Sequence, residues 1–127
     1  RQALDEEGIA VKEARILVLG MAYKPDIDDT RGSPSFELVA RLRALGAEVA
    51  YSDPHIPETK PVRGYDLQLV SQPMSAETVE SYDALLIATD HQAFDYGLIA
   101  RHARIIVDTR NALAAHSREV RGRIVKA

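Results

Sequence analysis

The sequence predicts an α/β domain, doubly wound around a mainly parallel sheet of about five strands. Short apolar runs rich in β-branched residues recur along the chain, and such runs form strands that are covered on both faces. Helical or proline-rich stretches separate these runs, as in parallel crossover units. The chain has 127 residues, of which 46% are hydrophobic, so it is long enough to form one buried core without disulfides or metals.

The first predicted strand is the run ARILVLG at 14–20, and a helix is expected after a polar stretch. Ser33 is a suitable N-cap for this helix, and Pro34 suits its first position. Apolar side chains between 38 and 45 repeat with helical spacing. Gly46 follows them, so we expect it to adopt the left-handed conformation that ends many helices.

The second predicted strand is AEVAYS at 47–52, and the short return from the helix implies a right-handed parallel crossover. Residues 53–64 contain three prolines and are expected to form a surface loop. A weak strand is expected at 67–70. A short helix should follow at 75–81, with Ser75 as its N-cap.

The last two predicted strands are DALLIAT at 83–89 and RIIVD at 104–108, with a helical turn or two between them at 90–100. A half-Rossmann arrangement puts the strands in the order 67–70, 47–52, 14–20, 83–89, 104–108. Ligands of such sheets bind beyond the carboxyl ends of the strands, where the strand order reverses. That point lies between the strands at 14–20 and 83–89.

Composition excludes several classes of function. The chain has no cysteine, which removes disulfides, thiolate metal sites and a cysteine nucleophile, and fits the cytoplasm, where we expect the protein. A formal net charge of −3 argues against nucleic-acid binding through the phosphate backbone. No run approaches the ~18 apolar residues of a membrane span, so no membrane segment is expected.

The loop GMAYKPDIDDTR at 20–31 enters the expected ligand crevice but matches neither common phosphate-binding motif. A G-x-G-x-x-G turn needs a glycine where the chain has Ala22, so NAD is not expected here. A Walker A loop needs Ser or Thr after its lysine, and none follows Lys24. Lys24 is either a phosphate ligand or an ordinary surface lysine, and Tyr23 either covers a base or packs beneath the loop.

The acidic cluster in this loop admits two interpretations. Asp26, Asp28 and Asp29 are close enough in sequence to suggest a Mg²⁺ or Ca²⁺ site. We favour the simpler interpretation, in which Asp29 pairs with Arg31 to brace the loop and the other acids face water. No metal site is therefore expected.

Two more polar residues follow buried strands. Arg110 leaves the strand at 104–108 directly into the crevice, where its planar guanidinium suits a phosphate or a ribose and base edge. The alternative is an ion pair with Asp108 or Asp90. For His91 we favour hydrogen bonding within a loop over catalysis, and we expect the other three histidines to face solvent.

Together these segments resemble the C-terminal UDP-binding domain of the UDP-glucose/GDP-mannose dehydrogenase family. The resemblance covers about residues 15–113. It is carried by the pattern Gly20-x-x-Tyr23-Lys24-x-Asp26-x-x-Asp29-x-Arg31-x-Ser33-Pro34 and by the segments GAEVAYSDPHIP, ATDHQAFDY and IVDTRNAL. Gly32 departs from the pattern, since the family usually has an acidic or amide side chain there.

The resemblance implies which residues meet the substrate. Tyr23, Lys24 and Arg110 are expected to contact the nucleotide of a UDP-sugar. A second group of residues is expected to shape the loop without reacting: Asp29, Arg31 and Ser33. No catalytic residue is expected in this chain, because the family's catalytic cysteine comes from upstream domains.

The resemblance also implies a longer parent protein. Residues 1–14 are interpreted as the end of a linking helix from an upstream domain, and 15–127 as the UDP-binding domain. The parent is expected to be a homo-oligomeric, NAD-dependent enzyme that oxidises a UDP-sugar, most like those acting on UDP-N-acetylhexosamines, with NAD bound by an upstream domain. The alternative is a non-enzymatic nucleotide-binding or regulatory module. A phospho-receiver is excluded, because Gly20 and Met21 stand where it needs an acidic pair.

Overall fold

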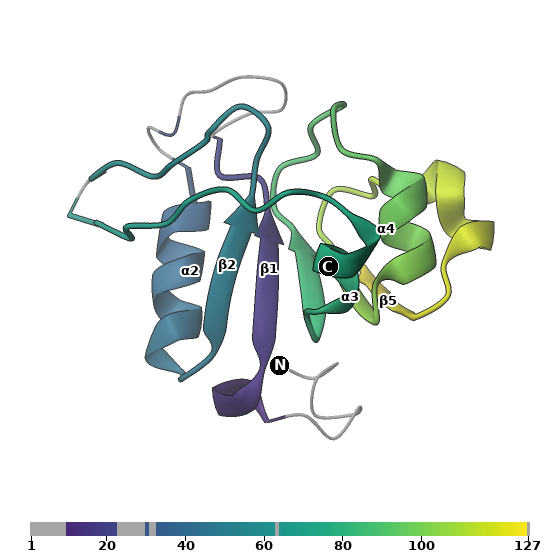
Figure 1. The fold of residues 1–127 in the computed structure, drawn as a ribbon, viewed down its shortest axis with the longest axis horizontal. Coiled ribbons are helices and arrows are strands. Elements are labelled where there is room, and N and C mark those ends of the chain that lie inside the picture. Colours follow the sequence, from purple (N-terminus) through teal and green to yellow (C-terminus); the bar gives the residue numbers. More distant parts are fainter. Residues whose placement is uncertain (1–9, 23–29, 31–32, 63, 127) are drawn as a thin grey trace.

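The computed structural model describes residues 10–22, 30, 33–62 and 64–126. Five parallel strands form one sheet with helices on both faces (Figure 1). This architecture confirms the α/β, doubly wound fold class predicted from the sequence. No helix within the described ranges has the length and apolar character needed to cross a bilayer.

The sheet has the order β2-β1-β3-β4-β5. Its strands are β1 (Arg15–Leu19), β2 (Glu48–Ser52), β3 (Ala84–Ile87), β4 (Ile105–Asp108) and β5 (Arg123–Lys126). The first four coincide with predicted strands and lie in the predicted order relative to one another. The order reverses between β1 and β3, at the point that the sequence predicts.

The expected strand at 67–70 is wrong. Gln68 has a φ of 54°, which an extended strand does not allow. The segment pairs locally with the preceding loop, where the N–H of Thr59 donates to the carbonyl of Leu69 at 2.9 Å. Leu67 is buried in the cluster on one face of the sheet. Its apolar side chain therefore covers the sheet, and the segment adds no strand to it.

Strand β5 was missed by the sequence analysis. It pairs with β4 in parallel and forms the edge of the sheet, with Ile124 and Val125 half-buried on opposite faces. Arg123 and Lys126 flank these two residues and are exposed. Two half-buried residues between two charges give a weaker signal than the fully apolar runs of the central strands.

In the described part of the chain η1 (Val11–Glu13) precedes β1, and four helical segments connect the strands: α2 (Ser35–Ala44), α3 (Ala76–Glu80), α4 (Tyr96–His102) and η2 (Ala114–Glu119). Helix α3 begins at the predicted cap, since the side chain of Ser75 accepts a hydrogen bond from Thr78. Gly46 follows α2 with a φ of 93°, as predicted.

The start of α2 differs by one residue from the prediction. Pro34 occupies the N-cap position rather than the first helical position. At this N-cap no side chain accepts a hydrogen bond from a backbone N–H of the first turn. The Oγ atom of Ser33 instead accepts a hydrogen bond from the N–H of Ser35 at 3.3 Å. Ser33 therefore precedes the N-cap by one residue, and its hydroxyl still accepts a hydrogen bond from the start of the helix.

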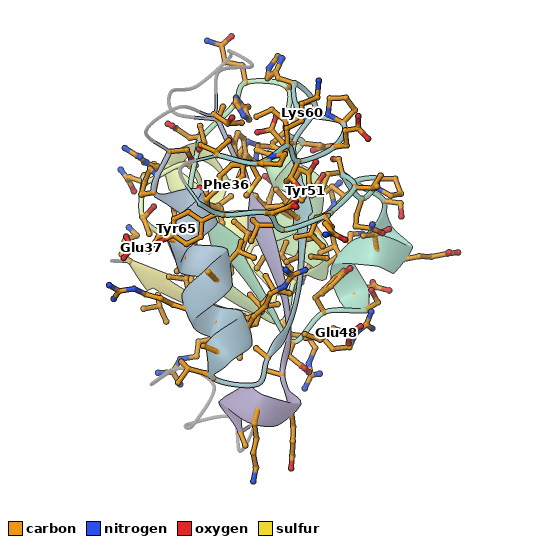
Figure 2. The ribbon with its side chains drawn as sticks, turned by 90° about the vertical axis from the view of Figure 1, so that its left-hand side faces the viewer. Phe36, Glu37, Glu48, Tyr51, Lys60 and Tyr65 are labelled. Atoms are coloured by element: carbon orange, nitrogen blue, oxygen red, sulfur yellow. The ribbon has the colours of Figure 1, made fainter. Side chains whose placement is uncertain are left out.

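Alternating side chains of β1 supply both halves of the core. Ile16 and Val18 pack with α2, in the cluster that contains Phe36 and Tyr51 (Figure 2). Leu17 and Leu19, which point the other way, pack with α3 and α4. Because both faces are covered, the edge at the carboxyl ends of the strands is left for polar loops.

Candidate functional site

The candidate site is the crevice at the carboxyl ends of β1 and β3, where the loops after these strands meet (Figure 1). Of the residues expected there, Ser33 and Arg110 are described by the structure. The others, with the neighbouring acidic residues and Gly32, lie outside the described residues: Tyr23, Lys24, Asp26, Asp28, Asp29 and Arg31. The proposed contacts of these residues therefore stay predictions.

Polar side chains from two other elements hold the chain where it leaves β1. Ser35, at the start of α2, donates its hydroxyl hydrogen to the carbonyl of Gly20 at 2.9 Å. Thr89, just after β3, donates to the carbonyl of Ala22 at 2.9 Å. The hydroxyl of Ser33 donates to the same carbonyl at 3.5 Å. Side chains from the start of α2 and from the end of β3 thus hold Gly20 and Ala22, two of the first three residues of the loop.

A buried carboxylate holds the same segment through its N–H groups. Asp53 directly follows β2 and is 1% exposed. Its Oδ2 atom accepts hydrogen bonds from the N–H of Met21 at 2.8 Å and the N–H of Ala22 at 3.3 Å. The Nε2 atom of His91 lies 2.8 Å from the same oxygen, and His91 is fully buried. The ends of β1, β2 and β3 are therefore connected through one carboxylate.

The side chain of His91 thus hydrogen-bonds to a residue of another loop, the one after β2. His55, which the sequence predicts to face solvent, is partly buried beside it. The His55 ring packs edge-on against the His91 ring, with centroids 4.7 Å apart. Its Nε2 atom is buried and has no hydrogen-bond partner within the described part of the chain. Phe94 closes the other side of His91, at 5.5 Å between ring centroids. The polar contact between His91 and Asp53 is thus enclosed by rings.

Tyr51 secures the turn that carries this carboxylate. Its hydroxyl donates to the carbonyl of Ile56 at 2.7 Å, across the turn that starts at Asp53. Burial, with smaller contributions from the negative charges of Asp53 and Glu58, raises the pKa of Tyr51 to about 12. The hydroxyl therefore stays protonated and remains a donor at neutral pH.

The loop after β4 is held in a similar way. The carboxylate of Asp108 accepts three backbone N–H groups at 3.0–3.1 Å, from Arg110, Ala112 and Leu113. The alternative in which Asp108 pairs with the guanidinium of Arg110 is therefore not what the structure has. The Nε atom of Arg110 donates instead to the carbonyl of Ala88 at 3.1 Å, which leaves its outer nitrogens beyond the end of β3.

Arg110 lines a pocket of about 260 Å³ between the start of α2 and the end of β3. The other lining residues are Pro34, Ser35, Leu38, Leu86, Ala88 and Thr109. The pocket combines an apolar floor with one cation at its rim, a combination typical of ligand sites. Arg110 is exposed, so its charge is accessible from the crevice.

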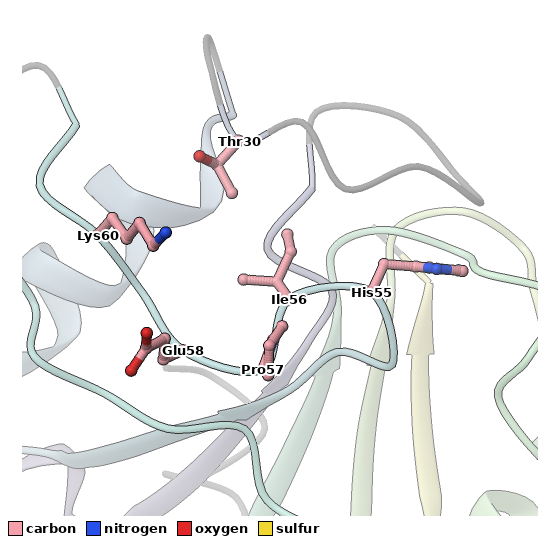
Figure 3. A pocket seen from close by; sticks show the side chains of 6 residues that line it. All are labelled: Thr30, His55, Ile56, Pro57, Glu58 and Lys60. Carbon is pink, nitrogen blue, oxygen red and sulfur yellow. The ribbon is translucent and has the colours of Figure 1, made fainter.

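A second pocket of about 250 Å³ lies over the loop after β2 (Figure 3). Figure 3 shows Lys60 and Thr30 pointing toward one another across it, with Glu58 at its rim. Arg110 supplies a positive charge to the first pocket. The carboxylates of Asp53 and Asp108 line neither pocket and already accept backbone N–H groups. Within the described residues, no group of three His, Cys, Asp or Glu side chains is placed to hold a metal ion.

Comparison with known proteins decides the family. Residues 17–115 match the model of the UDP-glucose/GDP-mannose dehydrogenase family, UDP binding domain. The chain belongs to this family. The matched range includes the loops after β1, β3 and β4, and it agrees closely with the range over which the sequence alone shows the resemblance.

Individual relatives agree with this assignment. The chain is 39% identical over 118 residues to a UDP-N-acetyl-D-mannosamine dehydrogenase of Pyrococcus horikoshii, covering 88% of this chain and 25% of the relative. It is 38% identical over 82 residues to a UDP-glucose 6-dehydrogenase of Bacillus subtilis, covering 64% of this chain and 17% of the relative. The chain thus spans about a quarter or less of the length of these dehydrogenases.

A solved structure gives the same answer for the fold. The structure of a UDP-D-ManNAc dehydrogenase from Pyrococcus horikoshii superimposes with a TM-score of 0.70 and 32% identity. The superposition covers 98% of this chain and 28% of that chain. A domain of this fold is therefore one part of that longer dehydrogenase chain.

Sequence reasoning placed Arg110, Ser33 and His91 at the crevice but missed the role of Asp53. Asp53 and His91 are far apart in sequence, so no local motif contains both. The available signal was positional: each follows a buried strand, and the two strands flank β1 in the predicted sheet. Parallel strands bring such residues to one edge.

Proposed function

We propose that this domain binds the uridine diphosphate of a nucleotide sugar and belongs to a longer NAD-dependent UDP-sugar 6-dehydrogenase. The observation that carries the proposal is the match of residues 17–115 to a UDP-binding domain family, in a fold that gathers the matched loops at one crevice. The sugar is left open, because the relatives include enzymes named for UDP-N-acetyl-D-mannosamine and for UDP-glucose. The nucleotide is common to these names.

Arg110 is the described residue that best suits the diphosphate. Its Nε atom is anchored on the carbonyl of Ala88, so the guanidinium is oriented before a ligand arrives. Arg110 shares its pocket with Pro34 and Ser35, where α2 begins, and the N–H groups of a first helical turn favour negative charge. A guanidinium beside a helix start is a good partner for phosphate oxygens.

The remaining contacts of this proposal involve the loop after β1. Tyr23 and Lys24 directly follow Ala22 in the sequence, and the backbone of Ala22 is held beyond the end of β1 by Asp53 and Thr89. We assign Lys24 to the phosphates and Tyr23 to the nucleoside. Asp29 and Arg31 act on the shape of the loop.

The dehydrogenase chemistry belongs to the rest of the longer protein. The chain offers no cysteine and no dinucleotide-binding motif, so NAD and the oxidation steps are assigned to upstream domains. In this proposal the UDP-binding domain comprises residues 15–127, and residues 1–14 connect it to the rest of the longer protein. Of this connection, residues 1–9 lie outside the described residues, and η1 is the helical segment that the structure describes in it. We further propose that the whole enzyme is a cytoplasmic homo-oligomer.

The proposal is tested by ligand-induced stabilisation of the 127-residue chain. UDP should raise the melting temperature in a thermal-shift assay, and NAD at equal concentration should leave it unchanged. The shift with UDP should be small, because a site completed by other domains loses contacts when it stands alone. Stabilisation by NAD without any response to UDP would reverse the assignment.

A further inference from the structure

The segment that presents Tyr23 and Lys24 is fixed by a residue to which no binding role has been assigned. Asp53 accepts the N–H groups of Met21 and Ala22, the last two residues before that pair. We propose that Asp53, locked by His91, is a positioning residue for UDP recognition, because it sets the point and direction at which the nucleotide-binding loop leaves the sheet. This inference rests on the proposed function.

Four hydrogen-bonding groups surround the carboxylate of Asp53. Its Oδ2 atom receives Met21 and Ala22 and faces His91, while its Oδ1 atom accepts the N–H of His55 at 2.8 Å. Three of these four donors lie on Oδ2 and one on Oδ1, so both oxygens of the carboxylate act as acceptors. An asparagine cannot replace it, since either orientation of the amide places an NH₂ group against a backbone N–H.

His91 fixes the orientation of this carboxylate. Since Oδ2 acts as an acceptor toward its other partners, Nε2 of His91 carries the hydrogen that it shares with Asp53. The ring is held by His55 on one side and Phe94 on the other. The hydroxyl of Tyr96 donates to the backbone carbonyl of His91 at 2.6 Å. This hydrogen bond connects the backbone of His91 to the start of α4.

The contacts of Asp53 lie beyond the paired part of the sheet. Strands β1 and β2 pair from Arg15 to Leu19, and the N–H of Gly20 still donates to the carbonyl of Ser52 at 3.0 Å. At Met21, beyond the paired residues, the backbone N–H donates to the carboxylate of Asp53 instead of to a strand carbonyl. Loss of its charge should therefore redirect the loop while the sheet stays paired.

Asp83 provides a comparison at the amino ends of the strands, on the side of the sheet away from the candidate site. Its Oδ2 atom accepts the N–H of Arg15 at 2.7 Å, and its Oδ1 atom pairs with Arg104 at 3.1 Å. Like Asp53, it holds the backbone of β1, but at the amino end of the strand. Asp83→Asn thus removes a less buried carboxylate that also binds the backbone of β1, far from the nucleotide-binding loop.

The test compares wild type with Asp53→Asn, His91→Phe, His91→Gln and Asp83→Asn in the 127-residue chain. UDP affinity is measured by titration calorimetry at a temperature at which circular dichroism shows each variant folded. Amide exchange at Met21 and Ala22, followed by NMR, reports the position of the loop directly. His91→Phe keeps a ring without the donor, and His91→Gln restores an N–H at similar reach.

We expect Asp53→Asn to weaken UDP binding about tenfold or more and to accelerate exchange at both amides, because hydrogen bonds to a buried charge are lost. His91→Phe should weaken binding about three- to tenfold, and His91→Gln should return it to within about twofold of wild type. Asp83→Asn should lower the melting temperature and leave the Kd within about twofold of wild type.

Three results would overturn the inference. In the first, folded Asp53→Asn and His91→Phe bind UDP within about twofold of wild type. In the second, Asp83→Asn weakens binding as much as Asp53→Asn does, which would indicate a general loss of stability. If Asp53→Asn does not fold, the two His91 variants decide by the same limits. A wild-type chain that binds no UDP overturns the proposed function itself, and this inference with it.

Discussion

A Cβ atom placed on Gly20 would lie 2.4 Å from the Cβ atom of Thr89 and 2.8 Å from its backbone N and O atoms. Gly20 ends β1 with a φ of 96°, a conformation that side chains rarely adopt. The loop after β3 therefore closes against the bare backbone of β1. This close approach allows the hydroxyl of Thr89 to reach the carbonyl of Ala22.

Gly20→Ala is accordingly expected to destabilise the domain strongly. Backbone strain at positive φ and overlap with the backbone of Thr89 together should cost about 2–5 kcal/mol. The measurement is urea unfolding, with Gly64→Ala as the control. Gly64 also has a positive φ, of 85°, but a Cβ atom there would meet no atom within 4 Å. Equal losses in the two variants would show that backbone strain alone accounts for the effect.

The charges assigned to the diphosphate give a second prediction. Lys24→Ala or Arg110→Ala, made in the longer dehydrogenase, should raise the KM for the UDP-sugar about ten- to a hundredfold, because each removes a charge-assisted hydrogen bond. The KM for NAD should change little, since lost ground-state binding of one substrate appears mainly in its own KM.

Two controls accompany this test. Lys60→Ala removes an exposed lysine on the loop after β2, and Arg118→Ala removes an exposed arginine on η2. Neither should change either KM by more than about twofold. If the Lys24 and Arg110 variants also stay within that limit, both residues are structural and the assigned diphosphate contacts are wrong.

A third prediction concerns activity. The 127-residue chain should not reduce NAD in the presence of a UDP-sugar, because it has no thiol to form the covalent intermediate that the family's second oxidation requires. NADH formation is followed by absorbance, with a heat-denatured sample as the reference. Turnover above that reference would refute the assignment of the chemistry to upstream domains.

The central strands were predictable because burial on both faces selects uninterrupted apolar runs. Val18 and Leu19 have partners on opposite faces of the sheet, so neither can be polar. At the edges this constraint weakens. Strand β5 needs only Ile124 and Val125 to be apolar, and Leu67 is apolar because it caps a cluster.

The site was predictable to the same degree. Arg110 and His91 follow strands that the sequence reveals, and the topology then places them at the crevice. The contact between Asp53 and His91 depends on side-chain directions at two strand ends, which no periodicity encodes. Sequence patterns therefore locate the carboxyl ends of the strands as the place of the candidate site. The hydrogen bonds of Asp53 and His91 that hold the loop there follow only from the packed fold.

The last prediction links Tyr51 to stability at alkaline pH. Its pKa is raised from 10.0 to about 12, mainly by burial, so the folded state holds the phenolic proton more tightly than the unfolded state does. A group with a raised pKa contributes its full stabilisation below the unfolded pKa and loses it as the pH rises toward the folded value. The free energy of unfolding should thus fall between about pH 10 and about pH 12 by up to about 1.4 kcal/mol per pH unit.

Tyr51→Phe isolates this contribution. Near pH 8 the variant should be less stable than wild type by about 1 kcal/mol, because the carbonyl of Ile56 loses its donor. Above about pH 10 the difference should shrink, because only wild type must give up the phenolic proton. Urea unfolding of both proteins across this range makes the comparison, and all other titrating groups, including Tyr82, are shared by the two proteins. Parallel stability curves would show that the Tyr51 proton is not linked to folding.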